Sequence, residues 1–149
     1  MPGNGGELQK ETYMQEPITV LIADDNAHMR ESLRVMLSAL ENVLLAGEAC
    51  NGEEAITMAT ELKPDVMLVD INMSPVNGFE ATRKILKQNP SIKIIALSLH
   101  KEVSYCRNML RLGARGYVSK SSSYAEILEA IREVAGGRKY VDKSIAGLL

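Results

Sequence analysis

Short runs of apolar residues recur along the chain at intervals that suit alternating strands and helices. Five such runs cover residues 18–23, 43–49, 65–70, 92–98 and 115–120. Several of them are nearly continuous in Val, Ile and Leu, which is typical of strands that are buried on both faces of a parallel sheet. We therefore expect five buried parallel strands.

Helical patterns fill the intervals between these runs. Apolar residues repeat at helical spacing in segments 33–40, 55–62 and 127–135, and more weakly in segments 79–88 and 101–112. The alternation predicts an α/β fold, with a five-stranded, doubly wound parallel sheet built from five βα units and right-handed crossovers.

Local signals mark where these helices begin and end. Asn51 with Glu54, and Ser123 with Glu126, have the spacing of a capping box before an apolar stripe. Gly113 falls where a left-handed helix end needs a glycine.

The chain divides into a polar start, one domain and a short C-terminal segment. Residues 1–16 are Gly-rich and aperiodic, and we expect a disordered tail. Residues 17–136 form the domain. Residues 137–149 contain a possible N-cap at Asp142 and a short apolar stripe that has no evident partner in the domain. We interpret this segment as the start of a linker.

Composition and charge exclude several classes of function. The formal net charge of -2 gives no general attraction to nucleic acid or to an anionic membrane. The two cysteines, Cys50 and Cys106, lack the spacing of a zinc site or a disulfide framework. No apolar run reaches membrane-spanning length, and residues 1–16 lack the apolar core of a signal peptide. We expect a cytoplasmic protein without membrane contact.

Polar residues end the predicted strands at their carboxyl ends, where open parallel sheets bind ligands. Along the chain these residues are Asp24 and Asp25 after the first run, Asp70 at the end of the third, Ser98 at the end of the fourth and Lys120 at the end of the fifth. Three carboxylates in one cleft repel one another unless a cation neutralises them, and oxygen ligands suit Mg²⁺. A carboxylate beside Mg²⁺, with an ammonium and a hydroxyl opposite, can accept a phosphoryl group, which makes Asp70 the candidate nucleophile.

Each of these residues also has a simpler explanation. The pair Asp24-Asp25 can cap the following helix, and Asp70 can cap the following loop. Lys120 can be a solvated charge, and Ser98 alone says almost nothing. The set is more specific than its members, because each residue ends the strand that the geometry requires.

The motifs at these strand ends resemble those of receiver domains in bacterial two-component response regulators, over residues 18–135. The matching motifs are Asp24-Asp25, the segment DINMSPVNG at 70–78, Ser98, and the segment GYVSK at 116–120. The resemblance implies a flavodoxin-like fold with strand order 2-1-3-4-5. It also implies that a sensor histidine kinase phosphorylates the protein. Within the family, the chain resembles the LuxR-type branch.

The resemblance assigns a metal-binding role to four residues. Asp25, Asp70 and the backbone carbonyl of Asn72 would bind Mg²⁺ directly, and Asp24 would act largely through water. Asp70 would also take the phosphoryl group from a phosphohistidine of the kinase.

The resemblance assigns the phosphoryl oxygens to Ser98 and Lys120. Tyr117 matches the aromatic switch of the family, which turns inward when Ser98 moves. The simpler expectation for Tyr117 is a half-buried aromatic residue on a strand.

The sequence departs from the family pattern in the loops beside the site. Ser74 replaces a usual Pro, with Pro75 one position later, so we expect a differently shaped loop. Ser121 replaces the Pro that often follows the lysine, which affects how Lys120 is placed. His100 occupies a position that tunes dephosphorylation in the family, as does Asn72.

The LuxR-type branch implies an output that lies outside this chain. We expect the natural protein to continue past Leu149 into a helix-turn-helix domain, and to contact DNA only through that domain. We also expect a phosphorylation-dependent homodimer that uses segments 101–112, 115–119 and 123–135. A stand-alone or degenerate receiver that acts through protein contacts is the alternative.

Two other functional classes fit the sequence less well. A haloacid-dehalogenase-like phosphatase needs a second acid where this chain has Asn72, whose amide cannot deliver a proton. A nucleotide-binding flavodoxin-like module needs a phosphate loop where this chain has Asp24 and Asp25, which repel phosphate.

Overall fold

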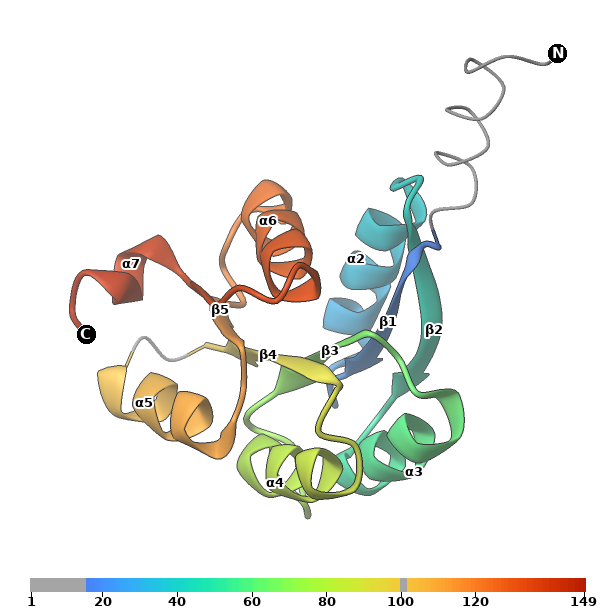
Figure 1. Ribbon diagram of the computed structural model, residues 1–149, viewed down its shortest axis with the longest axis horizontal. Coiled ribbons are helices and arrows are strands. Elements are labelled where there is room, and N and C mark those ends of the chain that lie inside the picture. The colour runs from blue at the N-terminus through green and yellow to red at the C-terminus, as the bar shows by residue number, and fades with distance from the viewer. Residues whose placement is uncertain (1–15, 100–101) are drawn as a thin grey trace, which may run out of the picture.

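Six parallel strands form one sheet with helices on both faces (Figure 1). The computed structural model describes residues 16–99 and 102–149. The predicted tail, apart from Glu16, and His100 therefore lie outside the described residues. The strands are β1 (Ile18–Ala23), β2 (Val43–Ala49), β3 (Val66–Asp70), β4 (Lys93–Ser98), β5 (Gly116–Ser119) and β6 (Tyr140–Val141). Their order, β2-β1-β3-β4-β5-β6, confirms the predicted order and adds one short strand at the edge.

Helices α2 and α6 cover one face of the sheet, and α3, α4 and α5 cover the other (Figure 1). The helices are α2 (Ala27–Ser38), α3 (Gly52–Leu62), α4 (Gly78–Gln88), α5 (Val103–Leu112), α6 (Tyr124–Ala135) and α7 (Lys143–Ala146). The apolar core is divided by the sheet into two clusters, and every residue of β3 is buried between them. Among the described helices, none is long and apolar enough to cross a bilayer.

The predicted helix ends are confirmed by their hydrogen bonds. The Asn51 side chain accepts from the Glu54 N–H, and the Ser123 side chain accepts from the Glu126 N–H. Gly113 ends α5 with φ +113°, a backbone conformation that strains any residue with a Cβ. The two N-cap hydrogen bonds fix where α3 and α6 begin, and Gly113 fixes where α5 ends.

The C-terminal segment corrects one expectation, because residues 137–149 do have partners in the domain. Strand β6 pairs with β5, and the side chain of Ile145 in α7 is fully buried in the same core cluster as Cys106, Met109 and Tyr117. The free edge of β5 offers unpaired backbone groups that an extended segment can use. A strand of two residues has no periodicity from which it can be predicted.

Candidate functional site

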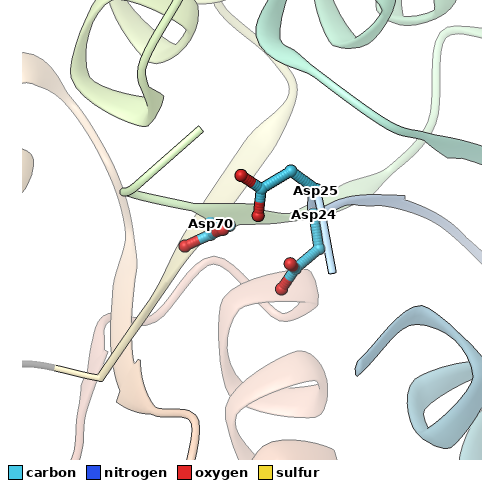
Figure 2. A group of neighbouring side chains, drawn as sticks. All are labelled: Asp24, Asp25 and Asp70. Carbon is cyan, nitrogen blue, oxygen red and sulfur yellow. The ribbon is translucent and has the colours of Figure 1, made fainter. Parts of the chain in front are cut away.

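Three carboxylates converge at the carboxyl edge of the sheet (Figure 2). Asp24 and Asp25 follow β1, and Asp70 ends the adjacent strand β3. One oxygen from each carboxylate lies within 4.8 Å of the others. Asp24 and Asp70 are buried, whereas Asp25 is exposed. The structure therefore brings together the three acidic residues singled out in the sequence, with one side open to solvent.

Lys120 reaches the two buried carboxylates from the end of β5. Its Nζ lies 2.8 Å from Asp24 Oδ2 and 3.2 Å from Asp70 Oδ2. Its side chain is only 10% exposed, so Lys120 is not a solvated surface charge. One ammonium facing three carboxylates leaves the cluster with net negative charge, a surrounding that favours binding of a cation.

The simpler explanation for Asp24-Asp25 does not hold, because Asn26 is the N-cap of α2. The Asn26 side chain accepts from the Met29 N–H at 3.1 Å. Asp24 instead accepts from the Asn26 N–H through Oδ1, at 2.8 Å. Its two carboxylate oxygens are thereby committed to a backbone donor and to Lys120.

The loop after β3 holds Asp70 at the base of the site. The Asn72 N–H donates to Asp70 Oδ1 at 3.0 Å, and the Asn72 side chain is exposed. A Cβ on Gly78 would lie 2.4 Å from the carbonyl oxygen of Asp70, so only glycine allows α4 to begin this close to the strand. The Ser74-Pro75 peptide bond in this loop is cis.

Burial and charge set the protonation of the two central groups. Burial raises the pKa of Asp70 to about 6, and repulsion from Asp24 adds to this, while the Asn72 N–H and Lys120 partly oppose it. Burial alone would lower the pKa of Lys120, but its contacts with Asp24 and Asp70 outweigh burial and raise it. At neutral pH Asp70 is therefore mostly ionised and Lys120 is charged.

Ser98 and Tyr117 lie side by side on neighbouring strands. Ser98 is buried at the end of β4, and its hydroxyl is hydrogen-bonded with that of Tyr117 on β5. Burial raises the pKa of Tyr117, and the hydrogen bond with Ser98 opposes this. The expectation of a half-buried tyrosine is wrong: Tyr117 is 0% exposed. The sequence did not show this, because the core that covers Tyr117 includes Ile145 from the C-terminal segment.

One buried acidic residue beside the site was predicted only as a helix cap. Asp142 does cap α7, since Oδ1 accepts from the N–H and hydroxyl of Ser144. Its Oδ2 also accepts from the Ser119 N–H at 3.1 Å and from the Ser122 hydroxyl at 2.6 Å. These two serines flank Lys120. The sequence offered one signal for this second role. Several serines surround Lys120, and their hydrogen-bond donors need acceptors when they are buried.

Sequence comparison finds relatives over most of the chain. Residues 20–132 match the response regulator receiver domain family. The response regulator GacA of Pseudomonas viridiflava is 40% identical over 129 residues, which are 87% of this chain and 60% of GacA. The response regulator UvrY of Escherichia coli K12 is 36% identical over 129 residues, 87% of this chain and 59% of UvrY. The chain thus spans about 60% of the length of these curated relatives.

Structure comparison finds the same architecture. A two-component response regulator of the LuxR family from Aurantimonas sp. SI85-9A1 superposes with a TM-score of 0.85 at 28% identity, covering 89% of this chain and 94% of that one. The isolated receiver domain of RcsB from Salmonella enterica serovar Typhimurium, solved with the phosphomimetic BeF₃⁻, superposes with a TM-score of 0.82 at 25% identity. The match covers 90% of this chain and 99% of that one.

Proposed function

Because the chain belongs to the response regulator receiver domain family, we propose that a sensor histidine kinase phosphorylates it on Asp70. The observation that carries this proposal is the convergence of three carboxylates at a single edge of the sheet (Figure 2), with the Lys120 ammonium group in contact with two of them. Proteins of this family are signalling proteins, and phosphorylation of Asp70 is the signal that we assign to this one.

The proposed reaction moves a phosphoryl group from a phosphohistidine nitrogen to a carboxylate oxygen of Asp70. The N–P bond breaks as the O–P bond forms, and the imidazole nitrogen keeps the electron pair. Asp70 has the protonation state that this requires, because a pKa of about 6 leaves it mostly ionised at neutral pH. The Asn72 N–H and Lys120 each contact one of its oxygens and so fix the orientation of the carboxylate.

We assign Mg²⁺ to the cluster of three carboxylates. The donors are all oxygens, as a hard cation prefers, and exposed Asp25 leaves the cluster open to a hydrated ion. Asp25, Asp70 and the backbone carbonyl of Asn72 are the proposed direct ligands. Asp24, already engaged by Lys120, acts largely through water. The ion, when bound, supplies positive charge against the carboxylates and the incoming phosphoryl oxygens.

Ser98 and Lys120 are the proposed ligands of the phosphoryl oxygens. Lys120 brings a positive charge, and Ser98 brings a hydroxyl donor. Because the Ser98 hydroxyl is also hydrogen-bonded with Tyr117, a phosphoryl oxygen that engages Ser98 changes the partners of Tyr117. We propose this exchange as the switch that relays phosphorylation to the surface formed by α5, β5 and α6.

We propose that the output is transcription, through a DNA-binding domain outside this chain. A relative from Brevibacillus brevis that is 33% identical over 135 residues is named transcriptional regulatory protein DegU. RcsB, a structural relative, has been solved as dimers bound to DNA. By analogy we propose a phosphorylation-dependent C₂ homodimer of this protein in the cytoplasm. A stand-alone receiver that acts through protein contacts is the second candidate.

Labelling with a small phosphodonor tests the proposal. With radiolabelled acetyl phosphate and Mg²⁺, the wild-type protein should take up an acid-labile, hydroxylamine-sensitive label, and Asp70→Asn should take up none. Asp65→Asn is the matched control, because Asp65 lies exposed just before the opposite end of the same strand. Equal labelling of the Asp70→Asn variant would overturn the assignment.

A further inference from the structure

The turn that carries Lys120 is held by hydrogen bonds among serines. The Ser122 N–H donates to the Ser119 carbonyl oxygen at 3.0 Å, and the Ser121 N–H donates to Ser119 Oγ at 3.1 Å. The hydroxyls of Ser119 and Ser121 lie 2.7 Å apart. Each of these contacts is internal to the turn and does not fix the turn against the rest of the fold.

Two attachments come from outside the turn: the Lys120 N–H donates to the Ser98 carbonyl oxygen at 2.8 Å, and Asp142 holds the residues on both sides of Lys120. Asp142 Oδ2 accepts from the N–H of Ser119, immediately before Lys120, and from the hydroxyl of Ser122, two residues after it. The same carboxylate holds α7 through Oδ1, which accepts from the Ser144 N–H at 2.8 Å and from the Ser144 hydroxyl at 2.7 Å. One buried side chain therefore connects the turn around Lys120 to the C-terminal segment.

The C-terminal segment is itself anchored, so it can act as a fixed support. Tyr140 in β6 donates its hydroxyl to Glu126 of α6 at 2.9 Å, and the Asp142 N–H donates to the Tyr117 carbonyl oxygen at 2.8 Å. Ile145 is fully buried against the core. These contacts fix Asp142 against β5 and α6 from both sides of its position in the chain.

We propose that Asp142 is a positioning residue for Lys120: it holds the turn so that the ammonium group reaches Asp24 and Asp70. This inference rests on the proposed function of the site and adds a part to it from outside the strand ends. It makes the C-terminal segment a component of the phosphoacceptor site. Misplacement of Lys120 weakens its contact with the phosphoryl oxygens, so loss of Asp142 slows phosphoryl transfer without touching the nucleophile.

The bridge needs a carboxylate. Asp142 accepts from four donors, two on each oxygen, and an asparagine amide has only one accepting oxygen. Burial by itself would raise the pKa of Asp142, but hydrogen bonds from Ser122, Ser144 and the Ser119 N–H outweigh it and lower the pKa to about 2. The carboxylate is therefore ionised throughout the physiological pH range, and Asn at this position leaves one side of the bridge without an acceptor.

Two variants and one control test the inference on the full chain. Asp142→Asn breaks one side of the bridge, and Ser122→Ala removes a single donor while leaving the carboxylate in place. Lys143→Gln is the control, because its exposed side chain neighbours Asp142 without entering the network. We expect the rate of labelling at saturating acetyl phosphate to fall about tenfold for Asp142→Asn and about threefold for Ser122→Ala, and to be unchanged in the control.

A second readout does not depend on phosphorylation. In the unphosphorylated protein, the NMR signal of the Lys120 ammonium should shift or broaden in both variants and remain unchanged in Lys143→Gln. Wild-type rates together with an unchanged Lys120 signal in both variants would overturn the inference while leaving the proposed function intact. Failure of the wild type to be labelled would remove the proposed function, and the Lys120 signal would still decide whether Asp142 positions the lysine. Ser122→Ala decides the matter if Asp142→Asn does not fold.

Discussion

Two buried aspartates, one that contacts the Lys120 ammonium and one that holds the turn around Lys120, have opposite electrostatic surroundings. Asp70 lies among other carboxylates, and burial, together with repulsion from Asp24, raises its pKa to about 6. Asp142 lies among hydrogen-bond donors, and its pKa is lowered to about 2. Both are at most 3% exposed, so burial alone does not separate them. The difference lies in their partners.

The partners indicate what each aspartate contributes. Asp142 accepts from four donors and stabilises the fold when ionised. Asp70 accepts from one N–H and shares one ammonium with Asp24, so its negative charge is poorly compensated until a cation and a phosphoryl group arrive. The negative charge of Asp70 is poorly compensated, as expected of a reactive carboxylate. The hydrogen-bonding capacity of Asp142 is satisfied, as expected of a structural one.

The largest expected effect is on stability at Asp142. Asp142→Ala removes the acceptor for four donors in a buried setting and should lower the free energy of unfolding by about 3 kcal/mol. Urea unfolding at pH 7 measures the change, with Lys143→Gln as the control. A change below about 0.5 kcal/mol, the range of ordinary surface substitutions, would mean that the network contributes little.

The second effect has the opposite sign and depends on pH. Without divalent cations, Asp70→Asn should raise the free energy of unfolding by about 2 kcal/mol at pH 7.5, because it removes a charge that is disfavoured in the folded state. The pKa of Asp70 rises from 3.8 to about 6 on folding, so the wild type loses stability as pH rises through that interval. The advantage of the variant should therefore disappear near pH 4. An advantage of equal size at both pH values would contradict the charge argument.

A third effect concerns the cation. Millimolar Mg²⁺ should stabilise the wild-type protein by about 1 kcal/mol, because a few carboxylates bind this ion weakly and only in the folded state. Asp25→Ala should abolish that gain, whereas Glu41→Ala, on an exposed loop between α2 and β2, should retain it. Thermal unfolding with and without Mg²⁺ provides the measurement. An equal gain in the Asp25→Ala variant would remove Asp25 from the ligand set.

The smallest expected effect on stability concerns the hydrogen bond that ties Tyr140 of β6 to α6. Tyr140→Phe removes the hydrogen bond to Glu126 and should lower the free energy of unfolding by about 0.5 kcal/mol. Burial and the neighbouring carboxylates of Glu126 and Glu129 raise the pKa of the Tyr140 phenol, so it stays neutral between pH 6 and pH 9. Urea unfolding should show a difference that does not change between pH 6 and pH 9.

The strands and the strand-end residues could be predicted because each depends on local pattern, whereas the strand order came from the resemblance to receiver domains. Continuous apolar runs mark the buried strands, and a parallel sheet places the residues after those runs at one edge. This reasoning located Asp24, Asp25, Asp70 and Lys120 near one another before their distances were known. It could not say that Asn26, rather than the aspartates, caps α2, since Asp and Asn are both good caps.

What the sequence did not predict depends on contacts between distant segments. Strand β6 is two residues long, the full burial of Tyr117 involves a core shared with Ile145, and the second role of Asp142 requires that β6 pair with β5. None of these features has a periodicity or a spacing that can be read in advance. The segment interpreted as the start of a linker packs against the domain through β6 and Ile145.

The most direct test of the account is to locate the phosphoryl group on the chain. Borohydride reduces an aspartyl phosphate to homoserine, which marks the modified residue for peptide mass spectrometry. After treatment with acetyl phosphate and Mg²⁺, we expect homoserine at position 70 and at no other aspartate. Homoserine at Asp24 or Asp25, or labelled protein with Asp70 unreduced, would contradict the assignment of Asp70 as the phosphoacceptor.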